Sequence, residues 1–167
     1  MTTRSGHRQL WGGVLSLALL LGVGGCQGGL RPMNGINQQL NRLGSSASPS
    51  LSGNWLALIA TRQGGRAQVQ LIDLQRGAPV PLLGLNRADS LPTSVAVDQA
   101  GERLALVRQR DDRSELVLYR RSIQVAQSLA IEPAGVPQRV GISADGRVLA
   151  VQVSRGGLWQ VDLLELP

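Results

Sequence analysis

The amino-acid sequence predicts an all-β fold of about two and a half four-stranded propeller blades, and two observations predict it. One unit recurs three times, with spacings of 48 and 45 residues, opening at Gly53, Gly101 and Gly146 and continuing into a short apolar strand. The chain also holds 21 glycines and 8 prolines, which is typical of a turn-rich β protein. Short strands repeating at about 40–50 residues are typical of propeller blades.

The second repeat shows how each blade divides into strands. Apolar residues alternate over 94–97, an apolar run covers 104–107, and two further strands are expected over 116–119 and from about 123 to 129. Turns at 98–101 and at Asp111-Asp112 separate the first three. Four short strands, each too small to bury a core of its own, make one blade.

The third repeat follows the same plan, with strands expected over 140–143, 148–153 and 158–164. Tight hairpins need residues that tolerate positive φ, so the repeat-opening residues are assigned structural turn roles: Gly53, Gly101, Asp145 and Gly146. This repeat reaches Pro167 before a fourth strand, which predicts a partial or open propeller. Three alternatives follow: a strand supplied by residues 30–45, an open stack of sheets, or association with another copy.

The first repeat is irregular, because the segment before its glycine is two residues shorter than its counterparts. The propeller domain is expected to span 49–167, with repeats at about 49–91, 92–136 and 137–167. Residues 26–48 are rich in Gly, Asn, Gln and Ser and are expected to form a flexible tether. Within them Ile36, Leu40 and Leu43 would form one apolar stripe on a helix, although so short a helix is marginal by itself.

The first 25 residues are expected to be a signal peptide rather than part of the fold. A basic segment over residues 4–8 precedes an apolar run over 10–23, which is shorter than the about 20 residues of a spanning helix. The segment resembles a bacterial lipoprotein signal, in which Cys26 is lipidated and becomes the mature N-terminus; an uncleaved N-terminal anchor is the alternative. The resemblance implies a periplasm-facing, membrane-anchored protein, and Gln27 implies the outer rather than the inner membrane.

The repeats resemble those of TolB-like β-propeller proteins of bacterial envelopes, whose WD-like repeat opens approximately as Ser-Pro-Asp-Gly-Lys/Arg. Residues 143–147 fit this opening, with Ala in place of Pro. Residues 154–157 and 61–64 match the next turn of the family repeat. Residues 69–73 and 158–162 match its closing strand, which ends in Asp. Residues 83–90 also resemble a segment of short lipoprotein members of the family. The resemblance covers about 49–167 and implies an envelope protein that binds a partner.

The residue content excludes several kinds of chemistry. The only histidine, His7, lies in the signal and the only cysteine, Cys26, on the anchor, so the mature domain cannot build a Ser-His-Asp or Cys-His site. The usual zinc ligand sets fail for the same reason. We therefore predict no catalytic residues, no metal and no cofactor. Structural roles in turns or at strand ends are expected for the acidic candidates: Asp73, Asp111, Asp112, Asp145 and Asp162.

The charge balance argues against nucleic acid as a partner. Without residues 1–25 the chain keeps 15 arginines against 11 acidic residues, a net charge of +4. It has no basic run and no aromatic stacking platform.

Three arginines, Arg62, Arg110 and Arg155, each stand nine residues after a repeat-opening glycine, so they are expected at equivalent hairpin tips along one rim. Two interpretations remain open: solvated turn residues, or a basic rim for an acidic partner such as a protein segment, a glycan acid or lipid headgroups. Trp55 and Trp159 occupy strand positions and are expected in the core.

Two functions follow from these observations. The first is a non-enzymatic envelope lipoprotein whose repeats bind a protein or other envelope partner, with the membrane bound through Cys26. The alternative is a structural module that completes its propeller by forming a homo-oligomer or by pairing with another envelope protein.

Overall fold

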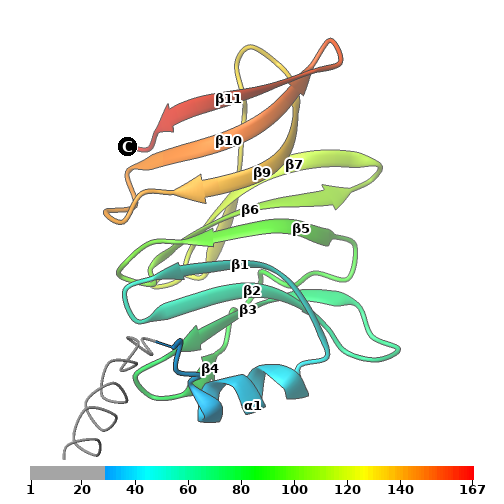
Figure 1. Cartoon of the computed structure of the whole chain (residues 1–167). Helices are drawn as coiled ribbons and strands as arrows, with labels where there is room; N and C mark the ends of the chain where they lie inside the picture. The colour runs from blue at the N-terminus through cyan, green and yellow to red at the C-terminus, as the bar shows by residue number, and fades with distance from the viewer. Residues whose placement is uncertain (1–28) are drawn as a thin grey trace, which may run out of the picture. The chain divides into compact units, whose positions relative to one another are not determined.

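The computed structural model describes residues 29–167, of which residues 33–167 form one compact unit. This unit consists of three antiparallel sheets and one short helix, so the prediction of an all-β propeller-repeat fold is confirmed (Figure 1). The expected signal peptide and Cys26 lie outside the described residues.

Each sheet is one blade, in which strands consecutive in the sequence pair with one another. Blade 1 comprises β1 (Ser45–Ser52), β2 (Trp55–Thr61), β3 (Ala67–Asp73) and β4 (Ala78–Val80). Blade 2 comprises β5 (Leu91–Val97), β6 (Arg103–Arg110), β7 (Arg113–Arg120) and β8 (Val125–Leu129). Blade 3 comprises β9 (Val136–Ile142), β10 (Val148–Arg155) and β11 (Leu158–Glu165).

The third sheet has the strand order β11-β10-β9, so β11 has one neighbouring strand among the described residues. The sheets form an open stack, which confirms the prediction of a partial or open propeller. Residues 30–45 do not supply the missing strand. They include α1 (Asn34–Arg42), which packs against blade 1 rather than blade 3.

Blade 1 is as complete as blade 2, and its irregular spacing has a simple cause. β1 and β2 are joined by the two-residue loop Gly53-Asn54, whereas residues 98–102 and 143–147 form longer turns at the same corner of blades 2 and 3. A register shift between Ala47 and Ser50 also interrupts the pairing of β1 with β2. The blade therefore starts at Ser45, four residues before the expected start of the domain.

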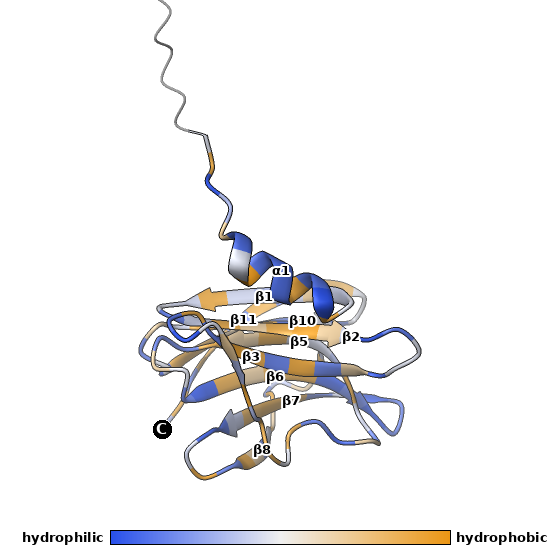
Figure 2. Ribbon diagram, turned by 90° about the horizontal axis from the view of Figure 1, so that it is seen from below, coloured by the Kyte–Doolittle hydropathy of each residue, from blue (hydrophilic) through white to orange (hydrophobic). Residues whose placement is uncertain are grey.

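The described part of the expected tether contains α1 and the start of β1. Leu40 and Leu43, from the apolar stripe, pack against Leu58, Ala60 and Ile72 of blade 1. A nine-residue helix is marginal alone, so this contact provides the stabilisation that the segment lacks in isolation. Figure 2 shows α1 as a largely hydrophilic ribbon above apolar strands. No helix within residues 29–167 is both long and apolar enough to cross a membrane.

The helix and the three blades form four layers with three apolar interfaces (Figure 1). Alternation along β6 explains why its sequence reads as a continuous apolar run. Leu104 and Leu106 face blade 1, while Ala105 and Val107 face blade 3, because successive side chains of a strand point to opposite faces. The middle of a strand that is buried on both faces therefore reads as a continuous apolar run.

Serine hydroxyls join the first strands of successive blades. The backbone N–H groups of Val95 and Val97 on β5 donate hydrogen bonds to Ser48 Oγ and Ser50 Oγ of β1, each over 3.2 Å. The N–H of Val140 on β9 donates to Ser94 Oγ of β5 over 3.1 Å. The same kind of bond therefore links blade 1 to blade 2 and blade 2 to blade 3.

Candidate functional site

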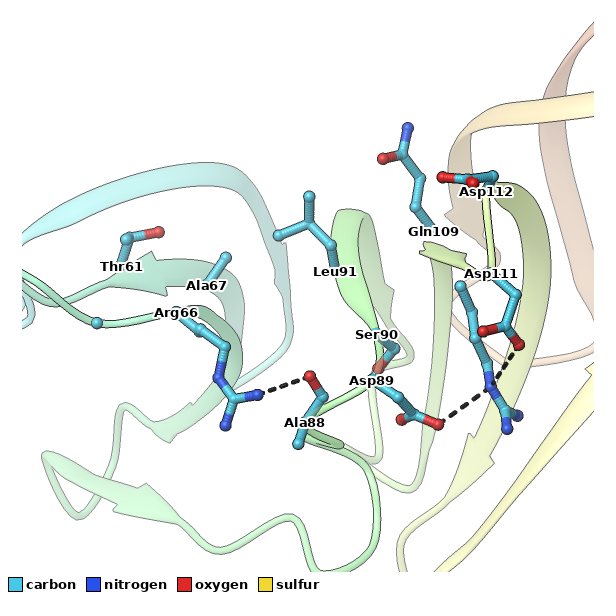
Figure 3. Close-up of a pocket in the computed structure, with 12 residues that line it drawn as sticks. Thr61, Arg66, Ala67, Ala88, Asp89, Ser90, Leu91, Gln109, Asp111 and Asp112 are labelled. Carbon is cyan, nitrogen blue, oxygen red and sulfur yellow. Dashed lines mark hydrogen bonds and ion pairs between the residues drawn. The ribbon is translucent and has the colours of Figure 1, made fainter.

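A groove of about 630 Å³ lies where the tips of blades 1 and 2 meet (Figure 3). The β2–β3 hairpin forms one wall, the β6–β7 tip forms the other, and the connection between β4 and β5 runs between them. The lining residues are Thr61, Gly65, Arg66, Ala67, Ala88, Asp89, Ser90, Leu91, Gln109, Arg110, Asp111 and Asp112.

The acidic wall owes its geometry to a two-residue hairpin loop. Asp111 and Asp112 connect β6 to β7 with φ values of 49° and 58°. Positive φ at both loop residues matches the twist of the flanking strands, and Asp tolerates it better than most residues. The loop presents the Asp111 side chain to solvent, with 85% of its surface exposed.

Ion pairs hold the centre of the groove. Arg110 Nε lies 3.2 Å from Asp89 Oδ2 and 3.7 Å from Asp111 Oδ2. Arg87 Nε donates to Asp89 Oδ1 over 3.0 Å, and this hydrogen bond holds the pKa of Asp89 below its usual value. On the opposite wall, Arg66 Nη1 donates to the carbonyl of Ala88 over 2.6 Å. The groove is therefore polarised, with Arg66 on the blade 1 wall and Asp111 and Asp112 on the blade 2 wall.

The three rim arginines lie at equivalent corners of their blades, after β2 for Arg62 and at the ends of β6 and β10 for Arg110 and Arg155. Arg110 forms the ion pairs of the groove, and Arg155 is bound within its own blade. Arg155 Nη1 lies 3.0 Å from Asp162 Oδ1, and Nη2 donates to the carbonyl of Pro133 over 2.7 Å. Arg62 has no ion pair with any residue of 29–167.

No local sequence feature marks the ion pair between Arg110 and Asp89. Asp89 reaches Arg110 from the connection between blades, 21 residues earlier in the chain. Asp162 faces Arg155 because β10 and β11 pair in a hairpin. The alternation of residues along β11 could have indicated the contact between Arg155 and Asp162. No comparable pattern indicates the contact between Arg110 and Asp89.

Several acidic side chains stabilise turns. Asp73 Oδ1 accepts hydrogen bonds from the N–H groups of Gln75 and Arg76, over 2.9 and 3.1 Å. Asp145 Oδ1 accepts from the Ser143 hydroxyl and from the N–H of Arg147, and the Ser143 contact is the main cause of its lowered pKa. Within residues 29–167, no three His, Cys, Asp or Glu side chains gather where they could hold a metal ion.

Among solved structures, the chain is similar to TolB from Acinetobacter baumannii, with 17% sequence identity and a TM-score of 0.54. The match covers 71% of this chain and 29% of that one. The chain folds as an open, TolB-like β-propeller. At this identity the likeness establishes the fold alone, and the chain spans less than a third of the TolB structure.

Two further solved structures in the comparison are those of a protease propeller domain and of a peptidase. The β-propeller domain of the Trilobed protease from Pyrococcus furiosus is 13% identical, with coverages of 73% and 42% and a TM-score of 0.48. An acylaminoacyl peptidase is 14% identical, with coverages of 66% and 18% and a TM-score of 0.49. No protein-family model matches the sequence, and no curated protein matches it.

A second groove, of about 650 Å³, follows the first strands of the three TolB-like blades. It is lined by residues 47–50 of β1, 93–96 of β5 and 139–142 of β9. Ser48, Ser50 and Ser94 already accept hydrogen bonds from the next blade. Most of its hydroxyl groups are therefore engaged in joining the blades.

The expectation that Trp159 lies in the core is wrong. Trp159 is 59% exposed on the face of blade 3 that points away from blade 2, beside Val161 and Leu163, which are 68% and 74% exposed. The strand pattern could not reveal this, because it places a side chain on a face without showing what covers that face. Trp55 is half-buried against the core between blades 1 and 2.

Proposed function

We propose that the chain is a non-enzymatic binding module of the bacterial cell envelope that holds a protein partner in the groove between blades 1 and 2. The observation that carries the proposal is the groove itself, in which an ion pair positions Arg110 and Asp89 and a hydrogen bond positions Arg66 before any partner arrives. Side chains held in place lose little conformational freedom on binding, so binding costs less free energy.

The polarity of the groove indicates the kind of segment that it fits. Arg66 lines the blade 1 wall, and Arg62 directly follows Thr61, the lining residue at the end of β2. Asp111 and Asp112 line the blade 2 wall. Leu91, which is 47% exposed, offers an apolar contact between the walls. An extended segment with acidic side chains toward blade 1 and basic side chains toward blade 2 would complement this arrangement.

Affinity capture from detergent-solubilised envelopes, with the full chain as bait, tests the proposal. The double variant Arg62→Ser/Arg66→Ser removes the basic wall and should reduce recovery of the partner severalfold. The matched control Arg76→Ser/Arg147→Ser removes two arginines that neither line the groove nor adjoin a lining residue in the chain. Equal recovery with both double variants would show that the groove does not hold the partner.

We further propose that lipidated Cys26 tethers the module to the outer membrane, facing the periplasm. Each buried methylene of an acyl chain adds about 0.8 kcal/mol, so a multiply acylated cysteine would hold the protein stably. Mass spectrometry of the mature N-terminus should find an acylated Cys26, and an unmodified start at Met1 would contradict the proposal. Separation of inner and outer membranes tests the location.

A second candidate function, a structural module that assembles with another chain, is favoured by two observations. β11 has one strand neighbour among the described residues, and one face of blade 3 exposes Trp159, Val161 and Leu163. Sedimentation of the full chain in detergent separates the candidates, since a single monomeric species at all concentrations argues against assembly.

A further inference from the structure

We propose that β11 pairs with β11 of a second copy of this chain, antiparallel about a two-fold axis through Val161. Each copy would thereby place a strand beside β11 of the other, whose only strand neighbour within residues 29–167 is β10. The inference rests on the assembly role proposed above and specifies its surface, partner and register.

The free edge of β11 is suited to pairing. In blades 1 and 2 a fourth strand, β4 or β8, pairs with the third strand, whereas β11 has only β10 beside it among residues 29–167 (Figure 1). β11 is eight residues long, contains no proline or arginine, and pairs with β10 without a register shift. Natural edge strands normally avoid association through charged side chains, prolines or bulges. β11 has no proline and no bulge, and the charge of its Asp162 is paired with Arg155. An edge without prolines or bulges is a template for another strand.

The sequence of β11 is complementary to itself about Val161. In an antiparallel pair, directly opposite residues lie on the same face and interact with each other. The proposed register matches apolar with apolar and polar with polar: Leu158 with Leu164, Trp159 with Leu163, Gln160 with Asp162, and Val161 with itself.

Two-fold registers centred on the residues next to Val161 place less compatible residues opposite each other. Centring on Asp162 would place two carboxylates opposite each other and Glu165 opposite Trp159, and like charges directly opposite are destabilising. Centring on Gln160 would place Asp162 opposite Leu158. In the Val161 register, the remaining negative charge near the axis belongs to Asp162, which Arg155 already neutralises.

Edge pairing also fits blade 3 better than the stacking of another blade on its exposed face. Where blades 1 and 2 have serines that accept a bond from the next blade, blade 3 has Arg139, which can only donate. Blade 3 also has Gln152 at the position that corresponds to the buried Ile59 of blade 1 and the buried Val107 of blade 2. This face therefore lacks the features that join the other blades.

Pairing would partly cover the same face. Trp159, Val161 and Leu163 lie on one side of β11, so the two-fold would align six apolar side chains from the two copies in one row. Contacts between aromatic and aliphatic residues across strands contribute about 0.2–1 kcal/mol each. The paired strands form a small interface compared with the standard of about 1,600 Å², so we expect a concentration-dependent dimer.

Disulfide trapping in the full chain, purified in detergent, tests the register. Opposite Cα atoms in an antiparallel pair are about 4.5–5.5 Å apart, within disulfide reach. Val161→Cys should form a covalent dimer on mild oxidation, while the parent chain and Ile123→Cys, at a 57% exposed position outside β11, should not. Mixed Trp159→Cys and Leu163→Cys chains should cross-link to each other, and neither should cross-link to itself.

Sedimentation of the full chain and of Val161→Asp completes the test. The variant places two carboxylates on the axis at an exposed position, so the dimer should dissociate while the circular dichroism spectrum stays unchanged. If the parent chain is dimeric, but Val161→Cys forms no covalent dimer and Val161→Asp leaves the dimer intact, the β11 pairing is overturned and an assembly role through another surface remains. If the parent chain is monomeric and Val161→Cys forms no covalent dimer, both are overturned.

Discussion

The hydroxyl of Ser94 on β5 accepts a hydrogen bond from the backbone N–H of Val140 on β9, over 3.1 Å, and so joins blade 2 to blade 3. Both residues are buried at this joint. Because the N–H of Val140 points away from its own sheet partner, a side chain of the neighbouring blade must satisfy it. Ser48 and Ser50 do the same between blades 1 and 2.

Removing this hydroxyl should weaken the stack. Ser94→Ala leaves the buried N–H of Val140 without an acceptor, which should lower the free energy of unfolding by about 1–3 kcal/mol. Ser46→Ala, at an exposed position of β1, should change it by less than about 0.5 kcal/mol. Urea denaturation followed by circular dichroism measures both, and equal effects would show that the hydroxyl does not join the blades.

The turn glycine Gly101 should tolerate alanine poorly for two reasons. Its φ is +64°, and an added Cβ would lie 2.3 Å from the Trp55 ring of blade 1. Gly64 has a similar φ of +71° but open space around it. Gly64→Ala should cost about 1–2 kcal/mol from backbone strain, and Gly101→Ala a further 1–3 kcal/mol, roughly, from overpacking. Equal losses in thermal unfolding would contradict this packing of Trp55.

Docking of α1 should depend on its apolar stripe. Leu43→Ala removes half of the leucine pair that packs against Leu58, Ala60 and Ile72. Because the side chain is only partly buried, we expect a loss of about 1–2 kcal/mol, below the range for fully buried leucines. Hydrogen exchange should accelerate in α1 and leave blade 2 unchanged. Gln38→Ala, on the exposed side, is the control, and unchanged α1 protection in Leu43→Ala would argue against docking.

The Arg155–Asp162 ion pair should make stability depend on pH in the acid range. The hydrogen bond from Arg155 holds the pKa of Asp162 below its usual value in the folded chain. The contribution is therefore complete above the unfolded carboxyl pKa of about 3.9 and is lost as the pH falls through the lower folded pKa. Arg155→Met should be less stable than the parent at pH 7, and the difference should shrink below about pH 4. A difference that stays constant down to pH 2.5 would contradict the pairing.

The blades were predictable because their determinants are local. Turn residues such as Gly146 recur at spacings of 48 and 45 residues, and alternation along each strand defines its two faces. Each strand of blades 2 and 3 could be located within a few residues for this reason. The start of blade 1 at Ser45 could not be located in this way, because the loop between the first two strands of blade 1 is shorter than the corresponding loops of blades 2 and 3.

The contacts between distant residues were not predictable. Asp89 meets Arg110 only after two blades have packed together, so the sequence alone suggested a freer basic rim. Exposure of Trp159 likewise depends on which sheet face remains uncovered. Docking of α1 on blade 1 depends on a receptive apolar surface that forms only when β2 and β3 pair.

The most direct test of the binding role is site-specific photo-cross-linking in intact envelopes. A photoreactive amino acid replaces Leu91 in the groove or, as the control, Val125 on β8 outside it; the two side chains are 47% and 48% exposed. We predict one discrete protein adduct from position 91, lost in the Arg62→Ser/Arg66→Ser background, and none from position 125. The same adducts from both positions, or none from position 91, would contradict a partner held between blades 1 and 2.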